Sequence, residues 1–254
     1  MSGAHFPDLA GRVAVVTGGS GSIGAATCRL FAAHKVRVAV VGRDERALED
    51  VREQAWNHGG EAIAVVADCT DPDALAHLCA RVAGELGPVD VLAAFAGGYG
   101  SPRPSVELPL QEWHRAIEGD LTSAFLTVQA FLPGMIAQGR GSVITMSSAA
   151  GRQPSRANVG YAAAKAGVVM LTRHLAAELA PSGIRVNCLA PSAVHNTRMD
   201  RYMTEQQLDE LGGTFPLGRL GEPPDIALAA AYLASDASSW ITGVTIDVAG
   251  GKVI

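Results

Sequence analysis

Three side chains with complementary chemistry lie within residues 148–165 of this chain. Ser148 follows the apolar run GSVITMS, Tyr161 comes thirteen residues later, and Lys165 lies four residues beyond the tyrosine. A spacing of four in a helical pattern puts the phenol and the ammonium group on one helix face. An ammonium group beside a phenol favours the phenolate, because opposite charges stabilise each other. Tyr161 could therefore exchange a proton with a carbonyl oxygen near neutral pH, while the Ser148 hydroxyl holds that oxygen.

The tyrosine–lysine spacing is weak evidence by itself, since a helix with one surface lysine has the same spacing. Its weight depends on the elements that would position the three side chains. Strand-like apolar runs alternate with longer amphipathic stretches along the chain, which predicts a parallel sheet covered by helices on both faces. The seven predicted strands are residues 12–17, 36–42, 61–68, 89–97, 141–147, 183–191 and 244–250.

No linker, composition break or repeat interrupts this alternation, so we expect residues 1–254 to form a single doubly wound α/β domain of the Rossmann type. Residues 107–138 read as one long helix or as two joined helices. The least patterned part is a polar segment at about 192–222, which contains the short helical piece TEQQLDELG. A loop of this length inside a compact domain is usually functional, so we predict a substrate lid there.

The first predicted strand turns into its helix through the glycine-rich sequence TGGSGSIG, residues 17–24. Glycines at such a turn let the backbone approach a pyrophosphate, and the helix N-terminus supplies positive potential. Any tight turn between a strand and a helix can carry glycines, so the motif alone is weak. Its place at the first strand–helix junction of a doubly wound chain favours a dinucleotide site.

The ends of the second and third strands bear on the choice of cofactor. Folds that select NAD usually have an acid after the second strand to bind the ribose 2′-OH, whereas an arginine there accommodates the 2′-phosphate of NADP. This chain has Gly42 and then Arg43, which predicts NADP, and we expect Asp44 to cap a helix. A solvated surface arginine explains Arg43 equally well. Asp68, after the third strand, could accept from the adenine amino group or start a turn before a helix cap at Asp71.

Composition excludes several classes of function. The net charge is −5 and no lysine or arginine run is present, which argues against a nucleic-acid or acidic-membrane surface. The seven histidines have no metal-ligand spacing, and the four scattered cysteines form no CxxC pair, so we expect reduced thiols and no metal. The N-terminus does not read as a signal peptide and no apolar run approaches membrane-spanning length, so we expect a cytoplasmic protein.

Together these residues resemble the short-chain dehydrogenase/reductase family, and the resemblance covers nearly the whole chain. It rests on TGGSGSIG, on Asp68, on AGG after the fourth strand, and on Ser148 with Tyr161-x-x-x-Lys165. It rests further on NCLAPS at 187–192 and on the C-terminal sequence PLGRLGEPPDIALAAAYLASDASSWITGVTIDVAGG. Generic dinucleotide-binding folds do not require that last segment, so it is the most specific of these motifs.

The resemblance implies an NAD(P)-dependent oxidoreductase with a sheet of strand order 3-2-1-4-5-6-7. In such an enzyme Ser148 polarises a carbonyl and Tyr161 is the acid/base. Lys165 holds the nicotinamide ribose and promotes the phenolate, and Asp120 occupies the position of a further active-site residue. The family is commonly homotetrameric, which implies a homotetramer or dimer with one interface on the helices at 108–138 and 158–180. The resemblance places the cofactor against Gly18, Ser20, Ser22, Ile23, Arg43, Asp68, Cys69, Ala96, Gly97, Tyr161, Lys165, Pro191, Val194 and Thr197.

The chain departs from the family pattern at several of these positions. Ser22 replaces a glycine of the turn, and residues 94–97 read Ala-Phe-Ala-Gly where the family usually has Asn-Asn-Ala-Gly. Asp120 replaces an active-site asparagine, and its carboxylate would offset part of the pull of Lys165 on Tyr161. The threonine that usually contacts the carboxamide is either Thr197 or replaced by Asn196.

We therefore predict an NADP(H)-dependent enzyme that interconverts a carbonyl and a secondary alcohol of a small molecule. A 3-oxoacyl thioester, a sugar, a steroid, a polyketide or a small diketone would each fit as substrate. The departures at Ser22, Asp120 and residues 94–97 leave a second hypothesis open, a catalytically impaired NADP-binding sensor protein. A third is another reaction on the same scaffold, such as epimerisation or dehydration.

Overall fold

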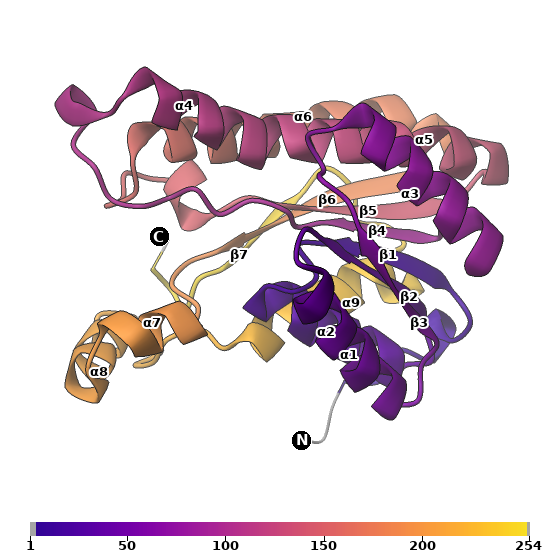
Figure 1. Cartoon of the computed structure of the whole chain (residues 1–254), viewed down its shortest axis with the longest axis horizontal. Coiled ribbons are helices and arrows are strands. Elements are labelled where there is room, and N and C mark those ends of the chain that lie inside the picture. The colour runs from indigo at the N-terminus through magenta and orange to yellow at the C-terminus, as the bar shows by residue number, and fades with distance from the viewer. Residues whose placement is uncertain (1–3, 253–254) are drawn as a thin grey trace.

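Seven parallel strands form one sheet in the computed structural model, which describes residues 4–252 apart from the side chain of Arg198 (Figure 1). Their order is β3-β2-β1-β4-β5-β6-β7, which confirms the order that the family resemblance implies. The strands are β1 (Val13–Thr17), β2 (Arg37–Gly42), β3 (Ala62–Val66), β4 (Val91–Ala94), β5 (Gly141–Met146), β6 (Ile184–Pro191) and β7 (Thr245–Val248).

Helices cover both faces of the sheet, with α1, α2 and α9 on one side and α3, α4, α5 and α6 on the other (Figure 1). They are α1 (Ser22–Ala33), α2 (Glu45–Asn57), α3 (Pro72–Glu85), α4 (Leu110–Ile117), α5 (Ser123–Gln138), α6 (Val159–Leu179), α7 (Thr197–Tyr202), α8 (Glu205–Gly213) and α9 (Pro223–Ala234). Short 3-10 turns lie at Pro7–Leu9, Ser105–Glu107, Ala149–Gly151, Ala180–Ser182 and Asp236–Ser238.

The central strands are buried on both faces, as expected for apolar runs in a parallel sheet. All five residues of β1 are buried, and Val15 is in register with Ala39 of β2 on one side and Leu92 of β4 on the other. Small side chains on α1 and α9 let these helices pack closely against each other. The strand order reverses between β1 and β4, so the carboxyl ends of these two strands flank the crevice where doubly wound folds bind ligands.

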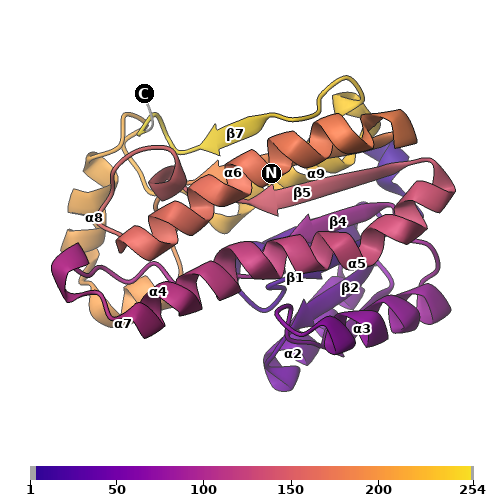
Figure 2. The ribbon, with the colours of Figure 1, turned by 90° about the horizontal axis from the view of Figure 1, so that it is seen from above.

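The segment that reads as one long helix or two is continuous and contains a π-helical turn. Helices α4 and α5 are joined by this turn, Glu118–Thr122, without a break (Figure 2). Helix α4 packs on α6, so the π turn lies beside the helix that carries Tyr161 and Lys165. Turns of this kind occur frequently at functional sites because the extra residue re-aims the side chains around it.

The same segment is the single stretch, among residues 4–252, with the length and composition of a membrane-spanning helix. Leu110–Gln138 spans 29 residues, and its most apolar window has a mean hydropathy of 1.2 with 39% of its residues buried. The expectation that no apolar run approaches membrane-spanning length is therefore wrong by that criterion. The criterion is weak evidence for a membrane, because core helices also meet it, and this segment packs on α3 and α6.

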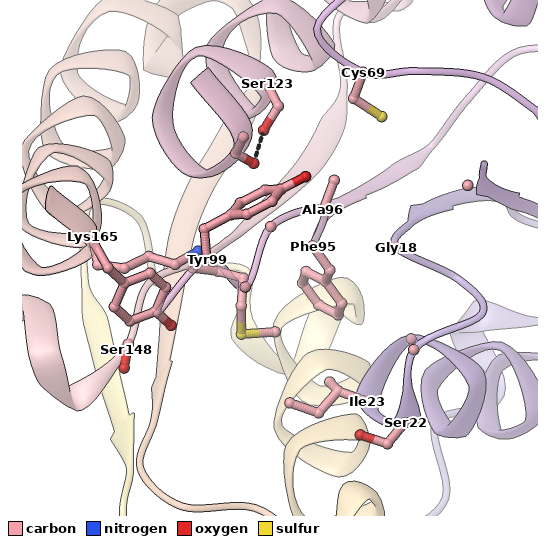
Figure 3. Close-up of a pocket in the computed structure, with 18 of the residues that line it drawn as sticks. Gly18, Ser22, Ile23, Cys69, Phe95, Ala96, Tyr99, Ser123, Ser148 and Lys165 are labelled. Atoms are coloured by element: carbon pink, nitrogen blue, oxygen red, sulfur yellow. Dashed lines mark hydrogen bonds between the residues drawn. The ribbon is translucent and has the colours of Figure 1, made fainter. Parts of the chain in front are cut away.

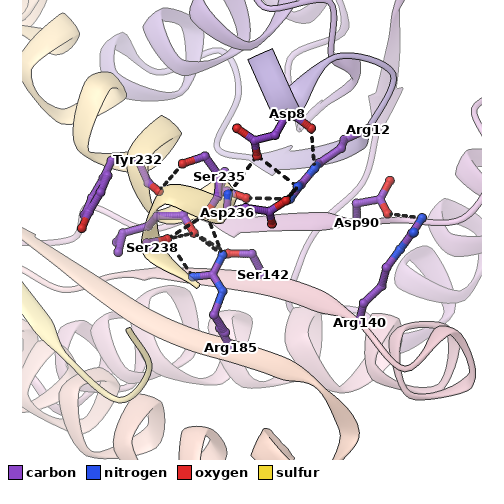
Figure 4. Close-up of polar contacts among 12 residues, drawn as sticks. Asp8, Arg12, Asp90, Arg140, Ser142, Arg185, Tyr232, Ser235, Asp236 and Ser238 are labelled. Carbon is purple, nitrogen blue, oxygen red and sulfur yellow. Dashed lines mark hydrogen bonds and ion pairs between the residues drawn. The ribbon is translucent and has the colours of Figure 1, made fainter. Parts of the chain in front are cut away.

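A polar network holds the edge of the sheet opposite to the crevice (Figure 4). Arg12 forms ion pairs with Asp8 at 3.0 Å and Asp236 at 2.6 Å, and so joins the N-terminal turn to the segment after α9. Arg185 of β6 donates to the Ser238 hydroxyl at 2.9 Å and to the Leu233 carbonyl oxygen at 2.9 Å. These contacts brace the sheet far from the candidate site.

Candidate active site

A cavity of about 800 Å³ runs along the carboxyl ends of the strands. Figure 3 shows Ser148 and Lys165 at one end of it and Gly18, Ser22 and Ile23 at the other. Most of the residues expected to bind a cofactor line this one cavity, together with Ser148. They are Gly18, Ser20, Ser22, Ile23, Arg43, Asp68, Cys69, Ala96, Gly97, Tyr161, Lys165, Pro191 and Val194. Asp120 lies buried beside the cavity, and Thr197 does not line it.

The glycine-rich turn forms a cradle that side chains would fill. Gly18 has a φ of 65°, and a Cβ there would lie 3.0 Å from the Phe95 carbonyl oxygen. A Cβ on Gly24 would collide with the Gly18 carbonyl oxygen. Helix α1 begins at Ser22 with no side-chain cap, so the first amides of the helix remain available to a ligand. Such a cradle fits the pyrophosphate of a dinucleotide.

The Thr17 side chain binds the backbone of residues 94–97, where the chain departs from the family pattern. The Thr17 hydroxyl, fully buried, accepts from the backbone N–H groups of Phe95 at 3.0 Å and Ala96 at 3.1 Å. It therefore ties the end of β1 to the loop after β4, at the point where the sheet opens into the cavity.

At the far end of the cavity, Arg43 and Asp68 lie close enough to interact electrostatically. Asp68 accepts from the Thr70 backbone N–H at 2.9 Å and from the Thr70 hydroxyl at 2.7 Å. Both hydrogen bonds lower the pKa of Asp68, and the bond from the Thr70 backbone has the larger effect. The positive charge of Arg43 lowers this pKa further. The neighbouring Asp44 caps α2 by accepting from the Ala47 N–H at 3.1 Å, as expected.

At the other end, β5 and α6 bring together Ser148, Tyr161 and Lys165. Ser148 ends the connection from β5, and its oxygen accepts from the Ala150 N–H at 3.2 Å, which leaves the hydroxyl proton free to donate. The ammonium group of Lys165 lies 5.6 Å from the centre of the Tyr161 ring. The Ser147 hydroxyl donates to the Lys165 carbonyl oxygen at 2.7 Å, which fastens α6 to the end of β5.

Lys165 is a buried cation with a buried partner. Its ammonium group donates to the Met146 carbonyl oxygen at 2.9 Å and forms an ion pair with Asp120 at 3.0 Å. The side chains of Lys165 and Asp120 are 3% and 0% exposed. The Asp120 carboxylate also accepts from the N–H groups of Gly98 at 2.7 Å and Tyr99 at 3.1 Å. An ammonium group has three donors, so one remains for a ligand in the cavity.

Residues at the start of the predicted lid segment line the cavity next to Pro191. Val194 pairs with Gly221, and His195 lies 2.7 Å from the Asp200 carboxylate. Asn196 lines the cavity, whereas Thr197 starts α7 and is exposed. Of the two positions considered for the carboxamide contact, the structure therefore places Asn196 at the cavity.

Some lining residues were absent from the sequence-based set, including Gly98, Arg115, Glu118, Gly119, Ser123 and Met199. Residues 115, 119 and 123 are spaced by four, which puts them on one face of a helix next to Asp120. This spacing could have predicted that they line the cavity. The cysteines are free, and burial raises the pKa of the Cys69 thiol in the cavity. Among residues 4–252, no group of three or more histidine, cysteine or acidic side chains could hold a metal ion.

Comparisons with known proteins give matches over nearly the whole chain. The family model described as enoyl-(acyl carrier protein) reductase matches residues 18–252. The cis-4-hydroxycyclohexanecarboxylate dehydrogenase of Sinomonas cyclohexanicum is 40% identical over 96% of this chain and 97% of its own length. The 3-oxoacyl-[acyl-carrier-protein] reductase FabG of Thermotoga maritima is 34% identical over 97% of this chain and 99% of its own length. A solved 7α-hydroxysteroid dehydrogenase with NADH and 7-oxo glycochenodeoxycholic acid is 33% identical, covers 100% of this chain and 98% of its own, and has a TM-score of 0.91.

Proposed function

The chain is an oxidoreductase of the short-chain dehydrogenase/reductase family, and on that premise we propose that it interconverts a carbonyl and a secondary alcohol with NADP(H). One observation carries the proposal. The buried ammonium group of Lys165 lies 5.6 Å from the Tyr161 ring centre, in the same cavity as Ser148 and the glycine cradle. Three roles thus meet in one cavity. Tyr161 can donate a proton, Lys165 favours the ionised form of Tyr161, and Ser148 can donate a hydrogen bond to a substrate oxygen.

In this proposal the bound nicotinamide cofactor supplies or accepts the hydride, and the chain's residues manage position and charge. During reduction, Tyr161 gives its proton to the carbonyl oxygen, to which Ser148 donates a hydrogen bond. During oxidation, Tyr161 as phenolate takes the proton from the alcohol. Lys165 stabilises that phenolate and uses its remaining donor on the cofactor ribose, while Asp120 balances part of its charge.

We assign the preference for NADP to Arg43. The second strand ends in Gly42, so no acid follows it to bind a ribose 2′-OH, and Arg43 lines the cavity in the place suited to a 2′-phosphate. The solved 7α-hydroxysteroid dehydrogenase holds NADH, so at least one relative of similar fold binds the cofactor that lacks the 2′-phosphate. The assignment to NADP rests on Gly42 and Arg43 alone.

We further propose a single domain in which residues 192–222 form the substrate lid, assembled as a homotetramer or dimer in the cytoplasm. The substrate would be a small secondary alcohol or ketone. The names of the relatives supply three chemically distinct candidates, a hydroxycyclohexanecarboxylate, a 7-oxo bile acid and a 3-oxoacyl thioester.

The test is oxidation of NADPH and NADH, and reduction of NADP⁺ and NAD⁺, by the purified protein against these three classes and a broader carbonyl and alcohol panel. Tyr161→Phe keeps the ring and removes the acid, and Tyr232→Phe on α9, outside the cavity, is the matched control. We expect turnover that favours NADP(H), is lost in Tyr161→Phe and is kept in Tyr232→Phe. Cofactor binding without turnover on any substrate would favour the sensor hypothesis, and product without net cofactor use would favour an isomerase or a dehydratase.

A further inference from the structure

The loop between β4 and the turn before α4 is held against the catalytic groups from two sides. On one side it is held by the carboxylate of Asp120, which accepts from the Gly98 N–H at 2.7 Å and the Tyr99 N–H at 3.1 Å. These bonds fix residues 97–101 to the π turn that also pairs with Lys165. The loop is therefore coupled to the lysine through one carboxylate.

On the other side the loop is held by Asn158, a residue that does not line the cavity. Its side-chain amide donates to the carbonyl oxygens of Tyr99 at 2.9 Å and Ser101 at 3.0 Å. Its side-chain oxygen accepts from the backbone N–H of Tyr161 at 2.9 Å and so caps α6. Asn158 is 3% exposed, and both polar atoms of its side chain have partners.

These three bonds require a carboxamide. Serine, threonine and aspartate can cap a helix, but a carboxylate donates no hydrogen bond and a hydroxyl donates only one. Asn158 is therefore matched both to the first turn of α6 and to the two loop carbonyl groups, and it joins them in one buried network.

The position of the loop also determines the space around the Tyr161 ring. Gly100 lies against the ring of Tyr161, so that a Cβ there would be 3.0 to 3.2 Å from three ring carbons. Tyr99 lies against Gly119, where a Cβ would come 2.5 Å or less from ring atoms of the tyrosine. The loop backbone thus forms one wall for the Tyr161 ring, and the wall cannot shift without changing the space open to the ring.

We propose that Asn158 is a positioning residue, which sets the Tyr161 phenol against the 97–101 loop and so holds it in line for proton transfer. This inference rests on the proposed role of Tyr161 as acid/base. A misplacement of about 1 Å in a catalytic group can cost on the order of 100-fold in rate. Loss of the two loop bonds should therefore lower the rate of the chemical step while leaving the cofactor site intact.

The test uses Asn158→Asp, which keeps a capping oxygen and loses both loop bonds, and Asn158→Ser, which keeps a capping oxygen and at most one loop bond. Asp71→Ser at the cap of α3 is the matched control. Gly100→Ala perturbs the same wall from the loop side and leaves Asn158 in place. The readouts are single-turnover hydride transfer, the NADPH dissociation constant, and hydrogen–deuterium exchange of the peptide that covers residues 97–104.

We expect both Asn158 variants to exchange faster in that peptide and to transfer hydride about 10- to 100-fold more slowly, with unchanged NADPH affinity. Gly100→Ala should slow hydride transfer, and Asp71→Ser should change neither quantity. Unchanged exchange in the loop, or a loosened loop with the parent rate of hydride transfer, would overturn the proposal. If the parent protein shows no turnover, the proposed function fails instead. The exchange rates then decide alone whether Asn158 fastens the loop, and unchanged rates overturn the fastening as well.

Discussion

The Lys165–Asp120 pair is the residue-scale feature that most distinguishes this site. Burying two charges is costly unless their remaining polar groups find partners. Here the ammonium group also donates to Met146, and the carboxylate accepts from Gly98 and Tyr99. The pair is therefore well satisfied, and Tyr161 faces a lysine whose charge is partly balanced.

Asp120→Asn should lower stability and move the pH–rate profile for alcohol oxidation toward acid. Asparagine has one acceptor oxygen for three donors, and breaking a buried pair costs about 3–5 kcal/mol. The uncompensated charge of Lys165 then favours the Tyr161 phenolate more strongly, which moves the profile toward acid. Denaturant unfolding and initial rates across pH measure both effects. Glu49→Gln, which removes an exposed carboxylate paired with Arg52, is the control. An unmoved profile would mean that the Asp120 charge does not act on Tyr161.

Arg43→Ala should weaken NADPH binding on the order of 10- to 100-fold, because hydrogen bonds to a charged group contribute about 1.5–3 kcal/mol. NADH, which lacks the 2′-phosphate, should bind as before. Arg46→Ala is the matched control, since Arg46 is exposed on the same segment and does not line the cavity. Titration of cofactor fluorescence gives the four dissociation constants. Equal losses for both cofactors would contradict the assignment of Arg43 to the phosphate.

At the scale of elements, the site depends on how closely α1 and α6 approach the strand ends. Gly24 of α1 lies against the backbone of Gly18 and Gly19, where a Cβ would come within 2.9 Å of three backbone atoms. Gly151 packs in the same way on the backbone of α6 beside Lys165. In both places a missing side chain allows a helix to reach the cavity, and backbone neighbours cannot move aside as a flexible side chain could.

Gly24→Ala should destabilise the protein by about 1–3 kcal/mol through overpacking and abolish cofactor binding. The matched control is Gly84→Ala on α3, where a Cβ would meet nothing within 4 Å. That control should stabilise by up to about 1 kcal/mol, because alanine restricts the unfolded chain more than glycine does. Thermal unfolding and cofactor titration of both variants decide the outcome. A Gly24→Ala protein that still binds NADPH tightly would show that α1 can move away from the turn.

At the scale of the whole molecule, large apolar side chains remain exposed on the α5–α6 side. Phe125 on α5 is 41% exposed and Met170 on α6 is 61% exposed. Helices in these positions are where the family resemblance implies an interface. A partner subunit covering them would remove that apolar area from water.

Phe125→Glu and Met170→Glu should each reduce the assembly to a smaller oligomer, because a buried unpaired carboxylate opposes association. Trp56→Glu is the control, since Trp56 is 59% exposed on α2, away from that side. Sedimentation velocity should show a tetramer or dimer for the parent and for Trp56→Glu. A parent that sediments as a monomer, or interface variants that sediment as the parent does, would contradict the proposed interface.

Local patterns determined most of the architecture. Apolar runs of strand length predicted the positions of all seven strands, because burial on both faces of a sheet demands such runs. Helical periodicity predicted most of the helices between them, but not α7 in the polar segment after β6. Spacing also determined that Tyr161 and Lys165 share a face of α6. The strand order followed from the family resemblance, and the pairing of the strands in the structure confirms it.

Tertiary structure decided the contacts between residues far apart in the chain. Asp120 and Lys165 meet because a π turn in one helix lies beside another helix, which no local period reveals. Asn158 reaches the loop after β4, and Thr17 secures that same loop where the family has asparagines. In each case the two hydrogen-bonded residues are far apart in the sequence and close together in the fold. Sequence determines which groups a chain can offer, whereas packing decides which of them meet.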